Sequence, residues 1–155
     1  MLIRRTCIPA LTLLGALALS PFSYAGGMEA PERVIDEYTP MHITLNQAEE
    51  MHGQKNVHFF DVNPDEIWNQ GHIPGATHLN QENWQALLPK DKGAALIFYC
   101  MNKLCTASTD AAREAKKLGY AHVYTMPDGI FGWMESGKDL ERGKIEEKDF
   151  TPGKS

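Results

Sequence analysis

Between residues 43 and 137, the pattern of hydrophobic and polar positions switches repeatedly between two periods. Short apolar runs rich in β-branched and aromatic residues predict strands, whereas apolar residues three or four positions apart predict helices. The predicted strands are Val57–Val62, Ala76–Leu79, Ala94–Tyr99 and His122–Met126. The predicted helices occupy residues 45–52, 64–70, 80–88, 107–118 and 130–136. This alternation predicts an open α/β fold, in which helices cover both faces of a parallel sheet.

Capping signals mark the ends of several of these helices. Thr44 and Gln47 have the spacing of a capping box, which indicates the start of the first helix. Asn63 is a typical N-cap residue, and Pro64 fits the first position of the second helix. Gly119 directly follows the fourth helix and is typical of a helix C-terminus. These signals support the helical interpretation of all three segments.

Residues 1–25 predict a signal peptide and therefore export. Arg4 and Arg5 precede an apolar run, and a small-x-small cleavage site ends at Ala25. The apolar run is too short to span a bilayer comfortably, and an uncleaved anchor is the alternative interpretation. We therefore expect an exported protein, either periplasmic or secreted.

Three further segments follow the signal peptide. Residues 26–42 are rich in Gly, Pro and Glu and predict a linker or N-terminal arm. Residues 43–137 hold the predicted strands and helices, and this length suits one domain. Residues 138–155 are charged, contain Gly and Pro, and predict a loose C-terminal tail.

Charge and cysteine count narrow the range of functions. Cleavage after Ala25 removes Arg4 and Arg5 but no acidic residue, so the formal net charge falls from −5 to −7. A chain this acidic offers no basic surface for nucleic acid or for an anionic membrane. Two of the three cysteines remain after cleavage. An even number of cysteines in an oxidising compartment suggests a disulfide for at least part of the time.

The two remaining cysteines lie in one short segment. The apolar run Ala94–Tyr99 ends directly before Cys100, and the next helical pattern begins just after Cys105. This layout places a thiol in a loop that leads into a helix N-terminus, where backbone N–H groups and the helix dipole stabilise a thiolate. Ligands of open α/β sheets bind beyond the carboxyl ends of the strands, which is where Cys100 falls.

Four features, in their order along the chain, resemble the rhodanese family of sulfurtransferase domains. They are Asp61 at a strand end, the segment Gly71–Ala76 (Gly-His-Ile-Pro-Gly-Ala), Cys100 at the end of another strand, and the segment Met126–Trp133. The resemblance covers residues 43–137 and implies a rhodanese-like open parallel sheet. It also implies that Cys100 takes a sulfane sulfur from a donor anion such as thiosulfate, or from a persulfide. The resulting Cys100 persulfide would pass the sulfur to a thiol acceptor, small or protein, without a metal or an organic cofactor.

The loop after the nucleophile is the substrate-binding element that this resemblance implies. Its backbone N–H groups would stabilise the anionic sulfur and any oxyanion of the donor. Lys103 either attracts the anion as a point charge or is a solvated loop lysine. The binding residues are then Met101, Asn102, Lys103, Leu104 and Thr106. Related phosphatases and arsenate reductases carry an arginine at the position of Thr106. A hydroxyl cannot replace that bidentate guanidinium, which argues against phosphatase chemistry.

The chain departs from the family pattern at two positions. Asn63 stands where the family commonly has an arginine after Asp-Val, and Lys103 stands where its loop usually has a glycine. Without that glycine the loop has less access to positive φ, so we expect its cradle to be shaped differently.

Cys105 and three supporting residues each have two interpretations. Cys105 is either a resolving thiol, which attacks the Cys100 persulfide and leaves a disulfide, or a small buried hydrophobe. Asp61 either orders the active-site loops or caps a turn at the strand end. His72 either holds its turn or moves protons, and Ser108 is either an N-cap residue or a hydrogen-bond donor toward sulfur.

These observations leave three functions open. The leading interpretation is a rhodanese-like sulfurtransferase that works through a Cys100 persulfide. The second is a thiol–disulfide oxidoreductase that uses Cys100 and Cys105 as its redox pair. The third is a non-catalytic binding module on the same fold, which would recruit a partner through the loop or the acidic N-terminal arm. A zinc site is disfavoured because a second Cys-x-x-Cys or a His-x-x-His spacing is missing.

Overall fold

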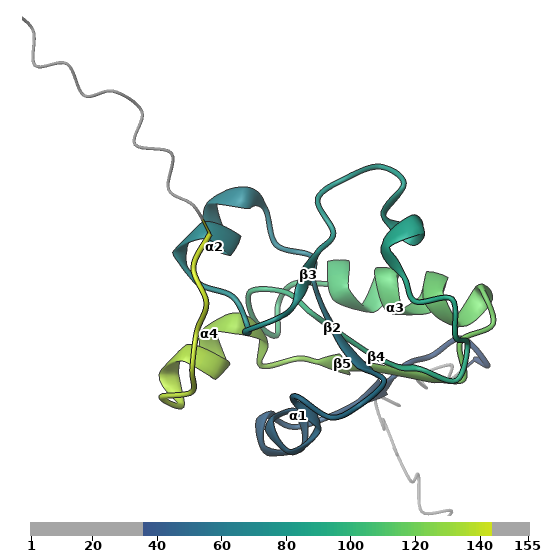
Figure 1. The fold of residues 1–155 in the computed structure, drawn as a ribbon, viewed down its shortest axis with the longest axis horizontal. Helices are drawn as coiled ribbons and strands as arrows, with labels where there is room; N and C mark the ends of the chain where they lie inside the picture. The colour runs from purple at the N-terminus through teal and green to yellow at the C-terminus, as the bar shows by residue number, and fades with distance from the viewer. Residues whose placement is uncertain (1–35, 144–155) are drawn as a thin grey trace, which may run out of the picture. The chain divides into compact units, whose positions relative to one another are not determined.

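The computed structural model describes residues 36–143, which lie within one compact unit of the chain. Within these residues, parallel strands form a single sheet in the order β1–β5–β4–β2–β3 (Figure 1). The strands are β1 (Met41–His42), β2 (Val57–Asp61), β3 (Thr77–His78), β4 (Ala95–Tyr99) and β5 (His122–Met126). The helices are α1 (Leu45–Met51), α2 (Asp65–Gln70), the 3-10 helix η1 (Trp84–Leu87), α3 (Ala107–Lys117) and α4 (Gly129–Glu135). The predicted α/β fold is therefore confirmed.

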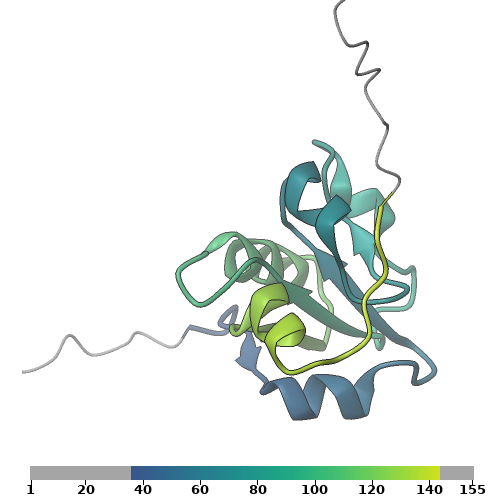
Figure 2. The ribbon, with the colours of Figure 1, turned by 90° about the vertical axis from the view of Figure 1, so that its left-hand side faces the viewer.

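β4 is the middle strand of the sheet, and its side chains alternate between two hydrophobic cores. Leu96 and Phe98 pack in the core that α3 covers, whereas Ile97 and Tyr99 pack in the core that α1 and α4 cover. Figures 1 and 2 show α3 on one face of the sheet and α1 and α4 on the other. All four side chains are fully buried. Packing on both faces therefore fixes the carboxyl end of β4 and the start of the loop that follows it.

The sequence signals at several helix ends are confirmed. Thr44 and Gln47 form the reciprocal capping box, in which the Thr44 N–H donates to Gln47 Oε1 at 2.9 Å. The Gln47 N–H donates back to Thr44 Oγ1 at 3.3 Å. α2 ends at Gly71, and Gly119 after α3 has a φ of +90°, which a side chain would disfavour.

Two helix predictions are wrong in part. Residues 80–88 form only the short helix η1, which contains no buried residue, so little packing supports a longer helix there. Asn63 does not cap α2: the N-cap residue is Pro64, and no side chain bonds to that end of the helix. The Asn63 side chain is instead buried, and its backbone N–H donates to Asp61 Oδ1.

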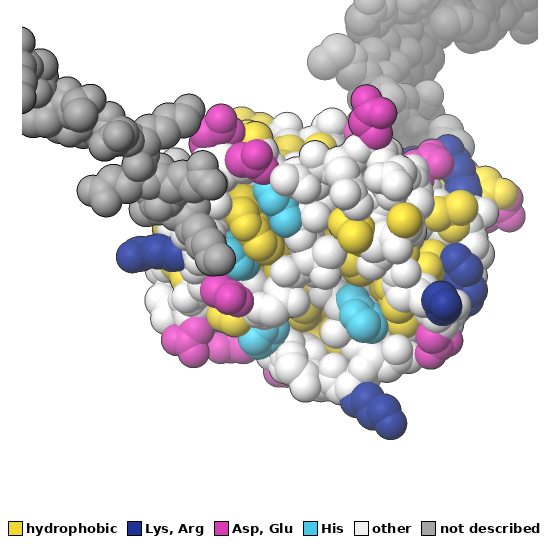
Figure 3. All heavy atoms as spheres, turned by 45° about the horizontal axis from the view of Figure 1, so that its top comes forward, with side chains coloured by type: hydrophobic (Ala, Val, Ile, Leu, Met, Phe, Trp, Pro, Cys, Tyr) yellow, Lys and Arg dark blue, Asp and Glu magenta, His cyan; other side chains and the backbone are white. Residues whose placement is uncertain are grey.

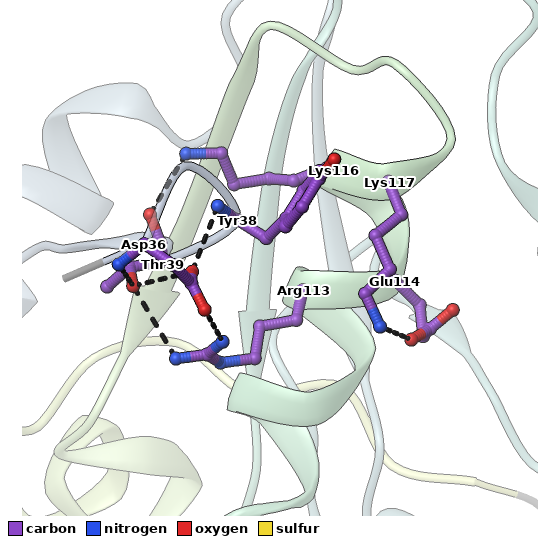
Figure 4. A network of polar contacts seen from close by, with 7 residues as sticks. All are labelled: Asp36, Tyr38, Thr39, Arg113, Glu114, Lys116 and Lys117. Atoms are coloured by element: carbon purple, nitrogen blue, oxygen red, sulfur yellow. Dashed lines mark hydrogen bonds and ion pairs between the residues drawn. The ribbon is translucent and has the colours of Figure 1, made fainter. Parts of the chain in front are cut away.

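The end of the predicted linker belongs to the folded domain. Met41 and His42 form the edge strand β1, which pairs with Tyr124 and Thr125 of β5. Figure 4 shows how the preceding turn is tied to α3. Arg113 Nη1 contacts Asp36 Oδ2 at 2.8 Å, and other polar contacts involve Lys116, Thr39 and Tyr38. The predicted signal peptide and the first part of the linker lie outside the described residues.

The folded domain also extends beyond residue 137 into the segment predicted to be a loose tail. His72 and Glu141 exchange backbone hydrogen bonds of 2.8 and 2.9 Å as an isolated antiparallel bridge. Leu140 packs against the core beneath α4, and Lys138 forms an ion pair with Glu49 of α1. Residues 138–143 therefore lie along the domain beside α2 (Figure 2), and the rest of the predicted tail is outside the described residues.

Candidate active site

Cys100 and Cys105 are joined by a disulfide at the carboxyl end of the central strand. Cys100 directly follows β4 and is only 3% exposed, whereas Cys105 is half-buried. Their Cα atoms are 6.2 Å apart, which lies within the normal range for a disulfide. The interpretation of Cys105 as an isolated buried hydrophobe is therefore wrong: its sulfur is bonded to the candidate nucleophile.

The backbone at Cys100 is held by the start of α4. The Cys100 carbonyl accepts the Ile130 N–H at 2.8 Å, and the Met101 carbonyl accepts the Phe131 N–H at 3.0 Å. Gly129 makes this approach sterically feasible, because its φ is +64° and a Cβ there would lie 2.4 Å from the Met101 carbonyl oxygen. The signal for this contact in the sequence is the Asp128–Gly129 pair, which lies within the motif Met126–Trp133.

The loop uses some of its amides internally. The Leu104 N–H donates to Asn102 Oδ1 at 3.0 Å, and the Cys105 N–H donates to the Asn102 carbonyl at 3.1 Å. Asn102 thus builds a turn inside the loop. Four other predicted binding residues have backbone N–H groups that donate to no atom within residues 36–143. These residues are Met101, Asn102, Lys103 and Thr106. These amides are the part of the predicted cradle that is still available to an anion.

Lys103 and Asp128 connect the loop to the start of α4. Lys103 Nζ lies 2.9 Å from Asp128 Oδ1, although the lysine side chain is 72% exposed. The cation predicted to attract a donor anion is therefore paired with a carboxylate in the disulfide-bonded form. A groove of about 360 Å³ lies beside this pair and is lined by Asn102, Leu104 and Phe131 among others.

Asp61 and Asn63 form a buried polar pair beside the strand that precedes the loop. Asp61 Oδ1 accepts the Asn63 N–H at 2.7 Å, the geometry of a turn capped by the strand-end carboxylate. Asp61 lies opposite Tyr99 of β4 in the sheet, and burial raises the pKa of its carboxyl group despite the opposing effect of the Asn63 amide. Asp61 Oδ2 and both polar atoms of the Asn63 side chain have no hydrogen-bond partner within the described chain. Sequence reasoning noticed Asn63 only as a departure and as a cap.

His72 and Ser108 are buried in different elements. His72 lies in the turn between α2 and β3, where its Nδ1 is 3.0 Å from the Trp68 carbonyl oxygen. Its ring stacks on Trp68 with the ring centres 3.4 Å apart. Ser108 is the second residue of α3, so it is not the N-cap residue; that position is taken by Thr106, whose side chain makes no capping hydrogen bond.

The described residues, 36–143, also bear on metal binding, membrane insertion and surface charge. In this part of the chain, no group of three or more His, Cys, Asp or Glu side chains could hold a metal ion. None of the helices that the structure describes is long and apolar enough to cross a membrane. On the face drawn in Figure 3, acidic and basic side chains are interspersed with apolar and histidine side chains.

The fold and the loop define an α/β domain with a disulfide-bonded cysteine pair at the carboxyl end of its central strand. The model of the rhodanese-like domain family matches residues 44–136, and the chain belongs to this family. The resemblance seen in the sequence motifs is thereby confirmed.

Relatives and solved structures agree with this assignment. The thiosulfate sulfurtransferase GlpE of Shewanella oneidensis is 30% identical over 96 residues, which cover 61% of this chain and 93% of that protein. The BH2092 protein from Bacillus halodurans superposes with a TM-score of 0.57 at 23% identity, covering 66% of this chain and 77% of that one. A polysulfide-sulfur transferase from Wolinella succinogenes gives a TM-score of 0.53 at 17% identity, covering 70% and 82% of the two chains. These two structures share the fold.

Proposed function

We propose that the protein is a sulfurtransferase that carries sulfane sulfur as a persulfide on Cys100. The family assignment and the GlpE relative support a sulfurtransferase-type enzyme. The observation that carries the proposal is the position of Cys100, directly after the buried central strand. It begins a loop in which several amides have no acceptor within residues 36–143. In parallel α/β sheets this edge is where ligands bind.

The proposed transfer begins from reduced Cys100 and needs no cofactor. The Cys100 thiolate attacks the sulfane sulfur of a donor such as thiosulfate, a new sulfur–sulfur bond forms, and sulfite leaves with the electron pair. A thiolate acceptor, small or protein, then attacks the outer sulfur and displaces the Cys100 thiolate. The free amides of Met101, Asn102, Lys103 and Thr106 would stabilise the negative charge on the persulfide and on the donor.

Cys105 is proposed as the resolving thiol. Its thiolate would attack the inner sulfur of the Cys100 persulfide, displace hydrosulfide, and leave the Cys100–Cys105 disulfide. The disulfide in the structure supports this step because it is the product that the step would leave. The sulfur–sulfur bonds broken and formed are equal in number, so no external oxidant is needed.

A second candidate function is favoured by the same disulfide. A thiol–disulfide oxidoreductase would exchange the Cys100–Cys105 bond with a partner dithiol and carry no sulfane sulfur. The two functions differ in the species that Cys100 carries between its steps. A persulfide supports the transferase, whereas a mixed disulfide with a partner protein supports the oxidoreductase.

Export to the periplasm or secretion is proposed as the setting of either function. The predicted signal peptide at residues 1–25 supports export, and a disulfide is the stable form of a cysteine pair in an oxidising compartment. Intact-mass measurement of the protein from its native host tests this proposal. A chain that begins at Gly26 supports cleavage, and a chain that retains Met1 in the cytoplasmic fraction contradicts it.

Mass spectrometry of single-cysteine variants tests the transferase. The full chain is reduced, freed of reductant, and treated with thiosulfate or polysulfide. We expect a lasting gain of about 32 Da, one sulfur atom, on Cys100 in Cys105→Ser, which has no resolving thiol. In the wild type the adduct should be transient and give way to the Cys100–Cys105 disulfide. Cys100→Ser should show no such adduct. If no adduct forms on Cys100 under any of these conditions, the transferase proposal fails.

A further inference from the structure

The two sulfur atoms of the disulfide differ in how a thiol can reach them. Cys100 is 3% exposed, and the strand that ends beside it is buried on both faces. Cys105 is half-buried, and its neighbours on both sides are exposed: Leu104 is 91% exposed, and Thr106 is exposed as well. A thiolate attacks a disulfide along the sulfur–sulfur axis, from the side opposite the leaving sulfur, so access decides which sulfur is attacked.

The two halves of the loop also differ in what holds them. The first half, Cys100 and Met101, is bonded through its carbonyl oxygens to the α4 residues Ile130 and Phe131. The second half, residues 102–106, is held by the turn around Asn102 and by the ion pair between the exposed Lys103 and the half-buried Asp128. At its end, the Thr106 carbonyl accepts the Asp110 N–H of α3 at 3.0 Å, whereas Cys105 itself is tied only to Asn102 and to the disulfide among the described residues. Breaking the disulfide therefore removes a main tether of the second half while leaving the first half in place.

We propose that a thiol opens the disulfide by attacking Cys105, so that Cys100 leaves as the thiolate. The attacking thiolate forms a new sulfur–sulfur bond with Cys105 Sγ, the Cys100–Cys105 bond breaks, and its electron pair goes to Cys100 Sγ. A second thiol then attacks the mixed disulfide, which yields reduced Cys105 and a disulfide between the two thiols. The reductant is thus any thiol that reaches the exposed side of the loop.

Attack at Cys105 links reduction of the disulfide directly to the release of the Cys100 thiolate. Cys100 is released in the first step, at the start of a loop in which the N–H groups of Met101, Asn102 and Lys103 have no acceptor within residues 36–143. Backbone N–H groups that turn toward the sulfur would stabilise its thiolate and make it the better leaving group. The second half of the loop carries the attacked sulfur away from it. The disulfide therefore acts as a thiol-operated gate on Cys100, and this consequence for sulfur transfer rests on the proposed function.

Glutathione, a monothiol, is the probe for the attacked sulfur. The oxidised full chain is mixed with glutathione in the presence of iodoacetamide, which alkylates the released thiolate, and samples are quenched in acid at short times. Trypsin cleaves after Lys103 and so separates the two cysteines into the peptides 93–103 and 104–113. The glutathione adduct can then be assigned to one sulfur without ambiguity.

We expect glutathione on peptide 104–113 and alkylation on peptide 93–103, with about tenfold or greater preference at the earliest times. A preference for peptide 93–103, or an even distribution, would overturn the proposal.

The second measurement is the rate at which glutathione opens the disulfide in Leu104→Asp, compared with Leu104→Lys. Charge beside Cys105 should slow the anionic probe in the aspartate variant and speed it in the lysine variant, with the difference shrinking at high salt.

The matched control places the same two substitutions at Leu118, an exposed leucine at the end of α3. These variants should open at the wild-type rate. Equal effects at positions 104 and 118 would contradict attack beside Cys105.

A sulfur-loading arm separates this inference from the proposed function. Oxidised wild type should take no sulfur from thiosulfate until a thiol is added, whereas Cys105→Ser should take sulfur without one. If reduced protein and Cys105→Ser both fail to load, the proposed function fails while the peptide assignment still stands. If both load but glutathione is found on Cys100, the proposed function stands and the polarity of the gate is wrong.

Discussion

The two halves of the cysteine loop, residues 100–101 and residues 102–106, are held in place by different kinds of contact. The first half, with Cys100, is fixed by a buried strand on one side and by two backbone hydrogen bonds from α4 on the other. The second half, with Cys105, is stabilised by its own turn, an ion pair, the disulfide and a backbone hydrogen bond from Asp110 to Thr106. In the proposed function, Cys100 would benefit from a fixed position, whereas Cys105 would have to approach and leave it. The different contacts of the two halves fit these two proposed roles.

The largest expected effect comes from disturbing the fixed half at Gly129. Gly129→Ala places a Cβ 2.4 Å from the Met101 carbonyl oxygen and also strains a φ of +64°, so the backbone of both elements must shift. We expect a loss of about 3 kcal/mol or more in the free energy of unfolding, measured by denaturant titration.

Gly137→Ala is the matched control for Gly129→Ala. Gly137 also has a positive φ, +73°, but a Cβ there meets nothing within 4 Å. Only the backbone strain applies, and the expected cost is about 1–2 kcal/mol. Equal costs for the two variants would mean that the close approach to Met101 does not hold the first half of the loop.

The next effect comes from releasing the second half through Cys105→Ser. Removing a cross-link that closes so short a loop should lower the free energy of unfolding of the oxidised protein by about 2 kcal/mol. Denaturant titrations with and without reductant measure it. Because the reduced wild type also lacks the cross-link, the difference should vanish in reductant. A difference that persists there would show that Cys105 contributes by packing instead.

A smaller, pH-dependent effect is expected from Asp61, beside the fixed half. Burial raises the pKa of the folded-state carboxyl above its ordinary value of 3.8. Folding therefore favours the protonated form, and this contribution to stability is complete below 3.8 and is lost as the pH rises through the folded-state pKa. As the pH rises from 3.8 through the folded-state pKa, Asp61→Asn should therefore gain stability relative to the wild type. Thermal unfolding across pH measures this difference.

Glu50→Gln, at an exposed carboxylate of α1, is the control for the loss of one negative charge. If Asp61→Asn follows the same pH dependence as this control, burial of the Asp61 carboxyl has no energetic consequence.

The smallest effect on stability is expected from Lys103→Ala. The ion pair joins a lysine that is 72% exposed to the half-buried Asp128, so solvent screens it and its loss should cost at most about 0.5 kcal/mol. Lys117→Ala, which breaks a comparable exposed pair with Glu114, is the control. A cost for Lys103→Ala well above the control would mean that the second half of the loop is held more firmly than its contacts indicate.

Much of the fold could be predicted because its periodic segments are also its buried ones. β4 reads as a continuous apolar run because both faces of the strand are covered. The prediction of a helix over residues 80–88 is wrong in part because the apolar residues there do not pack along one buried face. The sequence pattern does not predict β1, because its two exposed residues show no hydrophobic periodicity. Residues 138–143 have the charged composition of a tail, although Leu140 and a few backbone hydrogen bonds are enough to dock them on the domain.

The sequence by itself determined the chemistry at the centre of this protein: a cysteine after a buried strand, a second cysteine one loop away, and the motifs of the rhodanese family around them. These are local properties, set by hydrophobic period, turn residues and spacing. Only the tertiary structure decided that Gly129 packs against the backbone of Cys100 and Met101, that Asp128 pairs with Lys103, and that Asn63 is buried rather than capping. Each of these depends on segments far apart in sequence meeting at one sheet edge, and a contact of that kind leaves no periodic signal in the chain.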